Sequence, residues 1–334
     1  MSFDLSHFFS NDYCKSLKIS DWAYFEESSS ISFDHYEKWI EEKSPEILKY
    51  LEGENKTKRK DLTFFYPEFK SGIVFLFDYS NEKVVLENIL KKHENNLKLS
   101  SYVFGFEGED YHHYLKRNLN LIAQKISEKF NESGLEFSLT LDIHPALERD
   151  IAYRSGLGWF GKNSMFISKK HGSFFIIGSL LFNKKMKNNY LKQPFEDDHC
   201  GNCTKCIESC PTDAISISNR TINASKCIST YTIELYKDEL PPKGYPDSDK
   251  NIFGCDICQD VCPWNKKSLS IKNESTSFNN QMSNDIVNFF IKDSINSVKT
   301  KVDSMSGREF RKKFKNTPLD RFGKNGILKN INLF

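Results

Sequence analysis

The chain has 334 residues, which is room for about two domains. Hydrophobic residues make up 38% and charged residues 28%, which indicates a globular protein with a substantial core. The net charge of +2 is too small to indicate a nucleic-acid partner by itself, and the longest apolar stretch, Phe174 to Phe182, is too short to span a bilayer.

The first 60 residues are polar, and their pattern predicts mostly helix. The chain begins MSFDLSHFF, which contains an acid and no basic flank, so we expect no signal peptide and a cytoplasmic protein. A continuous apolar run, Gly72 to Tyr79, then predicts a strand that is buried on both faces.

A long helix and a strand are predicted next. From Tyr111, apolar side chains recur at helical spacing, which predicts an amphipathic helix to about Phe130. Phe137 to Leu141 alternates apolar and polar residues, which predicts a half-buried strand that ends at Asp142. Ligands of open α/β sheets bind beyond the carboxyl ends of the strands, so Asp142 is a candidate for chemistry. Alternatively, it caps the helix that follows Pro145.

A glycine-rich segment, Gly156 to Asn163, follows a short predicted helix over Ala146 to Ser155. Its three glycines allow the backbone to approach a neighbour closely. The letters fit G-x-G-x-x-G, but the segment follows a helix rather than a strand, so we expect no dinucleotide site. Met165 to Ser168 and Ser173 to Leu181 are predicted to form a hairpin.

Two cysteine runs carry the strongest signal. The first, CGNCTKCIESCP from Cys200, has the spacing C-x2-C-x2-C-x3-C-P, in which three cysteines bind one iron–sulfur cube and the fourth binds another. The second, CDICQDVCP from Cys255, repeats the last three positions, and the lone Cys227 can supply the missing ligand. The pattern predicts two [4Fe–4S] clusters, one on Cys200, Cys203, Cys206 and Cys262 and the other on Cys210, Cys227, Cys255 and Cys258.

Zinc sites and disulfides are the alternatives for these cysteines. Zinc explains paired C-x2-C motifs, but it does not explain the proline after the last cysteine of each run. Disulfides require a secretory context, which the N-terminus does not indicate. The ninth cysteine, Cys14, is expected to be a small buried hydrophobic residue.

The last part of the chain changes character. Ser268 to Ser283 is rich in Ser and Asn and is expected to be irregular. From Lys301 onward there are nine Lys or Arg residues against three acidic ones, with Phe310, Phe314 and Phe322 between them. Two interpretations stay open: a solvated charged face, or a surface for the phosphate backbone of a nucleic acid.

Several segments together resemble the epoxyqueuosine reductase family, cobalamin-dependent iron–sulfur enzymes that complete queuosine in the tRNA anticodon loop. The resemblance covers most of the chain from about residue 60 onward. Besides both cysteine runs, the matching segments are Gly108 to His112 (GEDYH), Leu141 to Arg149, Ser155 to Asn163 (SGLGWFGKN), His171 to Leu181, Cys227 to Glu234, Gly254 to Asn265 and Phe310 to Asn330.

The resemblance implies an α+β or α/β fold in three parts. These are a cobalamin-binding catalytic domain at 1–187, related to reductive dehalogenases, a ferredoxin-like domain with two [4Fe–4S] clusters at 188–270, and a short basic helical segment at 271–334. The implied reaction reduces epoxyqueuosine in tRNA to queuosine, with Asp142 as the proton donor. An external low-potential electron donor and a monomeric chain are expected.

The resemblance also implies cobalamin contacts, whereas His144 is expected to be structural rather than a cobalt ligand. The expected contacts are Asp142, Arg149, Gly158, Trp159, Lys162, Asn163, Ser229 and Thr232. Two other functions stay open, a corrinoid reductive dehalogenase and a ferredoxin-type electron carrier. The first has no need of a basic tail, and the second leaves Asp142 and the long region before the clusters unexplained.

Overall fold

The computed structural model describes residues 4–43, 46–130, 134–186, 188, 190–234, 248–271 and 275–333, and its contacts divide the chain into two compact units. The first comprises Met1–Asp78, His112–Gly161 and Phe166–Gly201, and the second Tyr79–Tyr111, Lys162–Met165 and Asn202–Phe334. These units differ from the predicted boundaries at 187 and 270, because residues 79–111 and the tail share one core. The predicted functional division stays a prediction.

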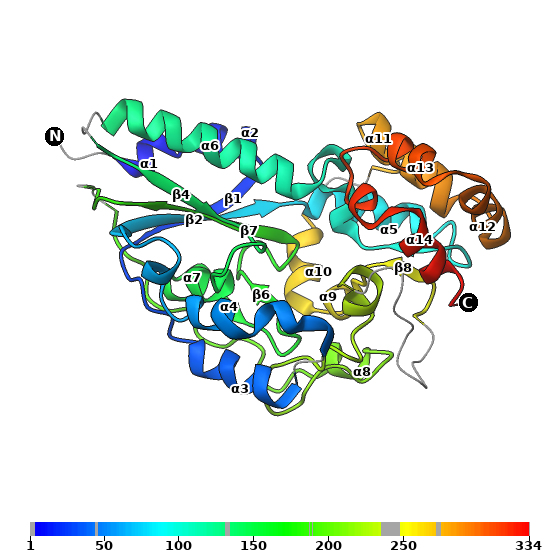
Figure 1. Cartoon of the computed structure of the whole chain (residues 1–334), viewed down its shortest axis with the longest axis horizontal. Coiled ribbons are helices and arrows are strands. Elements are labelled where there is room, and N and C mark those ends of the chain that lie inside the picture. Colours follow the sequence, from blue (N-terminus) through cyan, green and yellow to red (C-terminus); the bar gives the residue numbers. More distant parts are fainter. Residues whose placement is uncertain are drawn as a thin grey trace. The chain divides into compact units, whose positions relative to one another are not determined.

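An antiparallel sheet forms the centre of the first unit (Figure 1). Its strands lie in the order β1 (Ile19–Phe25), β2 (Ser71–Asp78), β7 (Phe175–Phe182) and β4 (Phe137–Thr140). The predicted apolar run forms β2, which is buried from Ser71 to Phe77. Because every neighbouring pair is antiparallel, the argument that placed Asp142 in the crevice of an open α/β sheet is wrong; the fold is a mixed α+β one.

Helices cover both faces of this sheet. The predicted long helix is confirmed as α6 (Tyr111–Phe130), which lies along one face, and α7 (Glu148–Arg154) lies on the other (Figure 1). Leu115, Leu119 and Ile122 of α6 are fully buried, as their spacing along one helical face requires.

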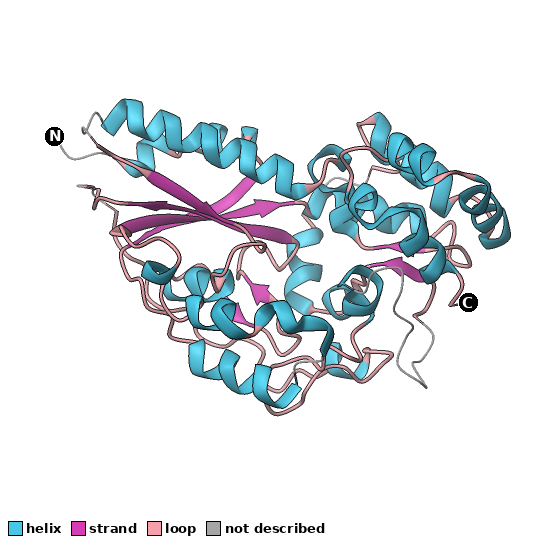
Figure 2. Ribbon diagram, in the orientation of Figure 1, coloured by secondary structure: helices cyan, strands magenta, loops and turns pink. Residues whose placement is uncertain are grey.

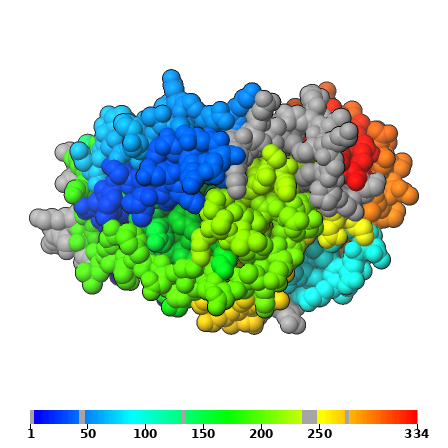
Figure 3. Space-filling model, turned by 90° about the horizontal axis from the view of Figure 1, so that it is seen from below, coloured from blue at the N-terminus to red at the C-terminus, as the bar shows by residue number. Residues whose placement is uncertain are grey.

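The N-terminal region is less helical than predicted, because it contains the strand β1. Its short helices are α1 (Leu5–Phe8), α2 (Asn11–Ser16), α3 (Phe33–Lys43), η1 (Glu46–Leu51), α4 (Gly53–Lys58) and η2 (Leu62–Phe64). The segment after β7 lies against the residues that follow β1, where Lys185 pairs with Glu26. Figure 3 shows blue surface of the N-terminal region bordering light-green surface.

The predicted hairpin is wrong. β6 (Phe166–Ile167) pairs with β5 (Trp159–Phe160), whereas β7 joins the main sheet. A bridge between Ser168 and Gly172 closes the turn between β6 and β7. Local alternation predicted strands here, but it could not determine which strands pair.

The second unit is mainly helical (Figure 2). Besides a two-stranded parallel sheet of β3 (Lys98–Leu99) and β8 (Asn251–Phe253), it contains α5 (Ser80–Leu90), η3 (Ser101–Gly108), α8 (Lys205–Glu208), η4 (Thr230–Glu234), α9 (Ile257–Asp260), α10 (Pro263–Leu269), α11 (Gln281–Ile286) and η5 (Val287–Ile291). The tail forms α12 (Ile295–Ser304), α13 (Gly307–Lys313) and α14 (Pro318–Ile331).

The basic tail is helical, as predicted, but its aromatic residues belong to the core. Phe310 and Phe314 are buried in one hydrophobic cluster with Phe253 of β8. Most of Ser268 to Ser283 is irregular, although α10 reaches Leu269, α11 begins at Gln281, and residues 272–274 lie outside the described part. In the described ranges, no helix combines the length and apolar character needed to cross a bilayer.

Candidate active site and cluster-binding residues

Asp142 lies in a tight turn directly after β4. The backbone N–H of Leu141 donates to Nδ1 of His144 at 3.0 Å, and the His144 N–H donates to the Leu141 carbonyl at 2.8 Å. The His144 ring also packs against Phe65. His144 is therefore engaged in the turn, in line with its predicted structural role. These bonds hold Asp142 with its side chain 49% exposed.

A histidine that was not among the predicted site residues contacts this carboxylate. His112, in the first turn of α6, places Nε2 2.9 Å from Oδ1 of Asp142. The His112 side chain is only 12% exposed whereas that of Asp142 is 49% exposed, so a largely buried ring restrains a carboxylate that reaches solvent. The signal in the sequence was the GEDYH motif, but nothing in the sequence linked it to Asp142.

The helix after the turn begins at Glu148, with Leu147 rather than Asp142 at its N-cap. The alternative in which Asp142 caps this helix is therefore wrong. Burial raises the pKa of Glu148 well above its ordinary value, and the nearby Asp142 carboxylate raises it further. Arg149, a predicted cobalamin contact, is exposed on the same helix.

The glycine-rich segment is explained by local packing. Gly156 has φ +78°, which favours glycine, and a Cβ on Gly158 would lie only 2.0 Å from the Ile167 carbonyl oxygen. Trp159 is buried, and its ring meets that of His199 edge to face. Gly158 and Trp159 therefore serve the pairing of β5 with β6 in this structure.

Lys162 and Asn163 contact the two cysteine runs. The Lys162 ammonium donates to the Cys203 carbonyl at 3.1 Å, and the buried Asn163 amide donates to the Cys258 carbonyl at 3.3 Å. These two predicted cobalamin contacts thus hold backbone groups of both predicted cluster loops.

The second predicted set of cysteines is brought together. Cys210 lies near enough to Cys227 to raise the pKa of its thiol, Cys227 has the same effect on Cys255, and both Cys255 and Cys227 raise the pKa of Cys258. Burial raises the pKa of the Cys258 thiol well above its ordinary value, and burial raises the pKa of Cys255 to about 12. A bound iron ion would favour the thiolate form of these cysteines through its positive charge.

Backbone donors point at the sulfurs of this set. The Ala214 N–H donates to Sγ of Cys210 at 3.3 Å, and the N–H groups of Ser229 and Thr230 donate to Sγ of Cys227. Hydrogen bonds to sulfur are a common feature of iron–sulfur sites. The observed arrangement therefore fits a cluster at these four cysteines.

The first predicted set is divided between the two units. Cys200 belongs to the first unit, whereas Cys203 and Cys206 flank or lie in α8 and Cys262 precedes α10 in the second. Cys206 lies near enough to Cys258 to raise the pKa of its thiol, so the two cysteine runs approach each other inside the second unit.

All nine cysteines are free thiols, so the disulfide alternative is wrong. Within the described residues, no three Cys, His, Asp or Glu side chains are grouped closely enough to hold one metal ion. A cube spaces its ligand sulfurs more widely than a tetrahedral zinc ion does, because four irons separate them. Cys14 is buried, as predicted, and burial raises the pKa of its thiol to about 11.

The other two predicted cobalamin contacts lie beside Cys227. Ser229 is partly accessible, whereas Thr232 is fully buried. The Thr232 hydroxyl donates to the Ile228 carbonyl at 2.7 Å and accepts from the Gly254 N–H at 3.0 Å. Thr232 therefore fastens the Cys227 segment to the residue before Cys255.

Comparison with known proteins agrees with these features. Residues 199–265 match the model of the 4Fe-4S double cluster binding domain, and residues 59–142 match the model described as epoxyqueuosine reductase QueG, DUF1730. The chain is 34% identical over 264 residues to the epoxyqueuosine reductase of Cyclobacterium marinum. The aligned region covers 79% of this chain and 78% of that protein. The chain belongs to the epoxyqueuosine reductase family.

Solved structures of the epoxyqueuosine reductase family share the fold. The enzyme from Streptococcus thermophilus has a TM-score of 0.72 at 21% identity, covering 96% of this chain and 78% of that chain. An epoxyqueuosine reductase solved with a tRNA-Tyr epoxyqueuosine-modified tRNA stem loop has a TM-score of 0.68 at 23% identity, covering 96% and 78%. The predicted fold, α+β or α/β with a double-cluster domain, is confirmed, and the antiparallel main sheet makes it α+β.

Proposed function

We propose that this chain reduces epoxyqueuosine to queuosine in the anticodon loop of tRNA, and is thus an oxidoreductase. The observation that carries the proposal is the accessible carboxylate of Asp142 held by His112. Both residues lie in the region that matches the epoxyqueuosine reductase model. A simple electron carrier needs no such pair, and the family of the chain is named for the reductase.

The reaction requires electrons, protons and a proton donor at one oxygen atom. Removing the epoxide oxygen leaves an alkene and water, and it consumes two electrons and two protons. Asp142 donates a proton to the oxygen as the C–O bond breaks, which avoids a free alkoxide. His112 holds the carboxyl group in place, and the second proton comes from water.

The electrons must come from cofactors, because no side chain supplies them at low potential. The first cluster would be held by Cys200, Cys203, Cys206 and Cys262, and the second by Cys210, Cys227, Cys255 and Cys258. Such cubes pass single electrons at potentials that the protein tunes. We also propose an external low-potential donor, a cytoplasmic location and a monomeric working chain.

Cobalamin is the proposed partner of the clusters, and when bound it supplies a cobalt centre that reaches low potential. Asp142, Arg149 and Ser229 have accessible polar groups that can bind the amides around a corrin ring. Gly158, Trp159, Lys162, Asn163 and Thr232 stay proposed contacts, and their local packing and hydrogen bonds hold the surrounding segments in place.

The test is a reaction with defined tRNA. The protein is loaded with iron, sulfide and cobalamin, and incubated with a low-potential reductant and tRNA from a strain that lacks the activity. Nucleoside mass spectrometry should show loss of one oxygen from the modified base. Unchanged tRNA from protein that carries both clusters and cobalamin would contradict the proposal.

A further inference from the structure

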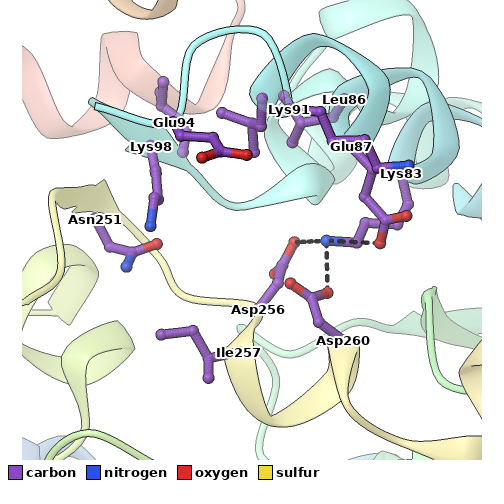
Figure 4. A pocket seen from close by; sticks show the side chains of 12 residues that line it. Lys83, Leu86, Glu87, Lys91, Glu94, Lys98, Asn251, Asp256, Ile257 and Asp260 are labelled. Atoms are coloured by element: carbon purple, nitrogen blue, oxygen red, sulfur yellow. Dashed lines mark ion pairs between the residues drawn. The ribbon is translucent and has the colours of Figure 1, made fainter. Parts of the chain in front are cut away.

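A cavity of about 420 Å³ lies inside the second unit, and Asp142 is not among its lining residues (Figure 4). One side is formed by α5, and the other includes Asn251 and residues of the second cysteine run itself. Its charged lining groups are Lys83, Glu87, Lys91, Glu94, Lys98, Asp256 and Asp260. The function proposed above uses none of them.

The centre of this group is a buried lysine. The side chain of Lys83 is 3% exposed, and its ammonium lies 2.5 Å from Oδ1 of Asp260 and 3.7 Å from Oδ2 of Asp256. Glu87, one turn further along α5, lies 3.5 Å from it (Figure 4). Burial alone would lower the pKa of Lys83, but the carboxylates of Asp256 and Asp260 raise it, so the lysine stays a cation.

The acids that Lys83 contacts are fixed in place. Asp256 is buried and accepts hydrogen bonds from the hydroxyl of Ser100, from the N–H of Ser101 at 2.8 Å and from the hydroxyl of Ser101 at 2.6 Å. Asp260 ends α9. Lys83 therefore joins α5 to both ends of the short helix that carries Cys258.

The same acids lie beside cluster ligands. Asp256 and Asp260 alternate in sequence with Cys255, Cys258 and Cys262. Asp256 directly follows Cys255, and Asp260 lies two residues from both Cys258 and Cys262. Any charge that offsets these acids therefore changes the potential at the second cluster.

A buried ion pair is a weak source of stability, because desolvation costs about as much as the attraction returns. The ion pair of Lys83 lies beside cysteines that are proposed to bind a cluster, which indicates a role in redox chemistry. We infer that Lys83 is a positioning residue that holds α9 and raises the reduction potential of the cluster bound by Cys210, Cys227, Cys255 and Cys258. Reduction adds negative charge to the cluster, so a fixed cation that offsets two carboxylates favours the reduced state.

This inference rests on the proposed cluster assignment but not on the proposed substrate. The test is a redox titration of the reconstituted protein followed by electron paramagnetic resonance, which needs neither tRNA nor cobalamin. Failure of epoxide reduction therefore leaves the result unaffected. Iron content is measured in parallel to show that both clusters are loaded.

Three variants test the effect of Lys83 on the midpoint potential of the second cluster. Lys83→Met keeps the length of the side chain and removes the charge, so the midpoint potential of the second cluster should become more negative. Glu87→Gln removes an acid from the partly exposed side of the network, so the midpoint should become more positive. Lys91→Met, an exposed lysine of the same cavity, should leave it unchanged.

An unchanged midpoint in fully loaded Lys83→Met protein would overturn the inference. If that variant does not load its iron, Glu87→Gln decides, and the absence of a positive shift overturns the inference equally. A negative shift in Lys91→Met as large as that in Lys83→Met would also overturn it, because any lysine of the cavity would then have the same effect.

Discussion

Asp142 combines exposure with restraint, which is what a proton donor requires. The turn Leu141 to His144 fixes its backbone, and His112 fixes one carboxylate oxygen. We expect Asp142→Asn to keep both clusters and cobalamin but to lose turnover by roughly 10²–10⁴, the usual contribution of a general acid. Single-turnover assays on tRNA measure this loss, and full activity in the variant would refute the acid role.

The neighbouring His144 predicts a pH dependence of stability. Burial lowers the pKa of His144 below its ordinary value of 6.5. The unfolded chain therefore binds this proton more readily than the folded one. Its contribution to stability should be present above about pH 6.5 and lost as the pH falls through the lower folded pKa.

Thermal unfolding between about pH 8 and pH 5 tests this dependence. His144→Asn can offer an oxygen near the position of Nδ1 but does not titrate there, so the variant should lose less stability than the parent on acidification. The exposed His113 supplies a control, and His113→Asn should follow the parent. Parallel curves for all three proteins would contradict the assignment.

At the scale of elements, the segment around Cys227 was assigned to the second cluster without a motif of its own, because the second cysteine run lacks one ligand. It supplies a single cysteine, far from either run, yet two backbone N–H groups donate to its sulfur. We expect Cys227→Ala to lose one cluster and keep the other, so that iron content falls by about half.

Iron analysis and electron paramagnetic resonance measure that change. Cys14→Ala is the matched control, because Cys14 is equally a free thiol but is buried in the first unit against the Phe9 carbonyl. It should keep all its iron. If Cys227→Ala keeps both clusters, the ligand assignment is wrong.

The sequence predicted those helices and strands whose hydrophobic pattern lies within one continuous stretch of residues. The apolar spacing of α6, the run that forms β2 and the alternation of β4 each lie within one stretch of sequence. The pairing of β5 with β6 and the antiparallel order of the sheet depend on residues far apart, and no local period encodes them.

The same limit applies to the site. Cysteine spacing led to a ligand assignment, because three closely spaced cysteines wrap one cube and the fourth points at another, and this assignment stays a prediction. His112 and Lys83 could not be assigned, since each acts on an acid that is distant in sequence and adjacent only after folding. The three tail phenylalanines were placed in a possible nucleic-acid surface, but helical packing buries them.

At the scale of the whole molecule, positive charge is concentrated in the tail although the net charge is only +2. Arg311, Lys312, Lys313 and Lys315 are exposed on and after α13. If they bind tRNA phosphates, replacing all four with neutral residues should flatten the salt dependence of binding. The slope should fall by up to about 0.7–0.9 for each phosphate that is no longer neutralised.

Binding measured across a salt series tests this surface. Lys38 and Lys49, exposed in the first unit, provide a control pair whose neutralisation should leave the slope unchanged. A slope that stays unchanged in the quadruple variant would favour the alternative, a solvated charged face.

The last turn of α14 contacts two segments that lie beside cluster ligands. Asn330 is fully buried, and its amide donates to the carbonyl of Thr232 at 2.9 Å and to that of Ile252 at 2.8 Å. It thereby links the stretch after Cys227 to the stretch before Cys255. A chain that ends before Asn330 should therefore lose restraint on both segments, and its iron content after reconstitution should fall below that of the parent.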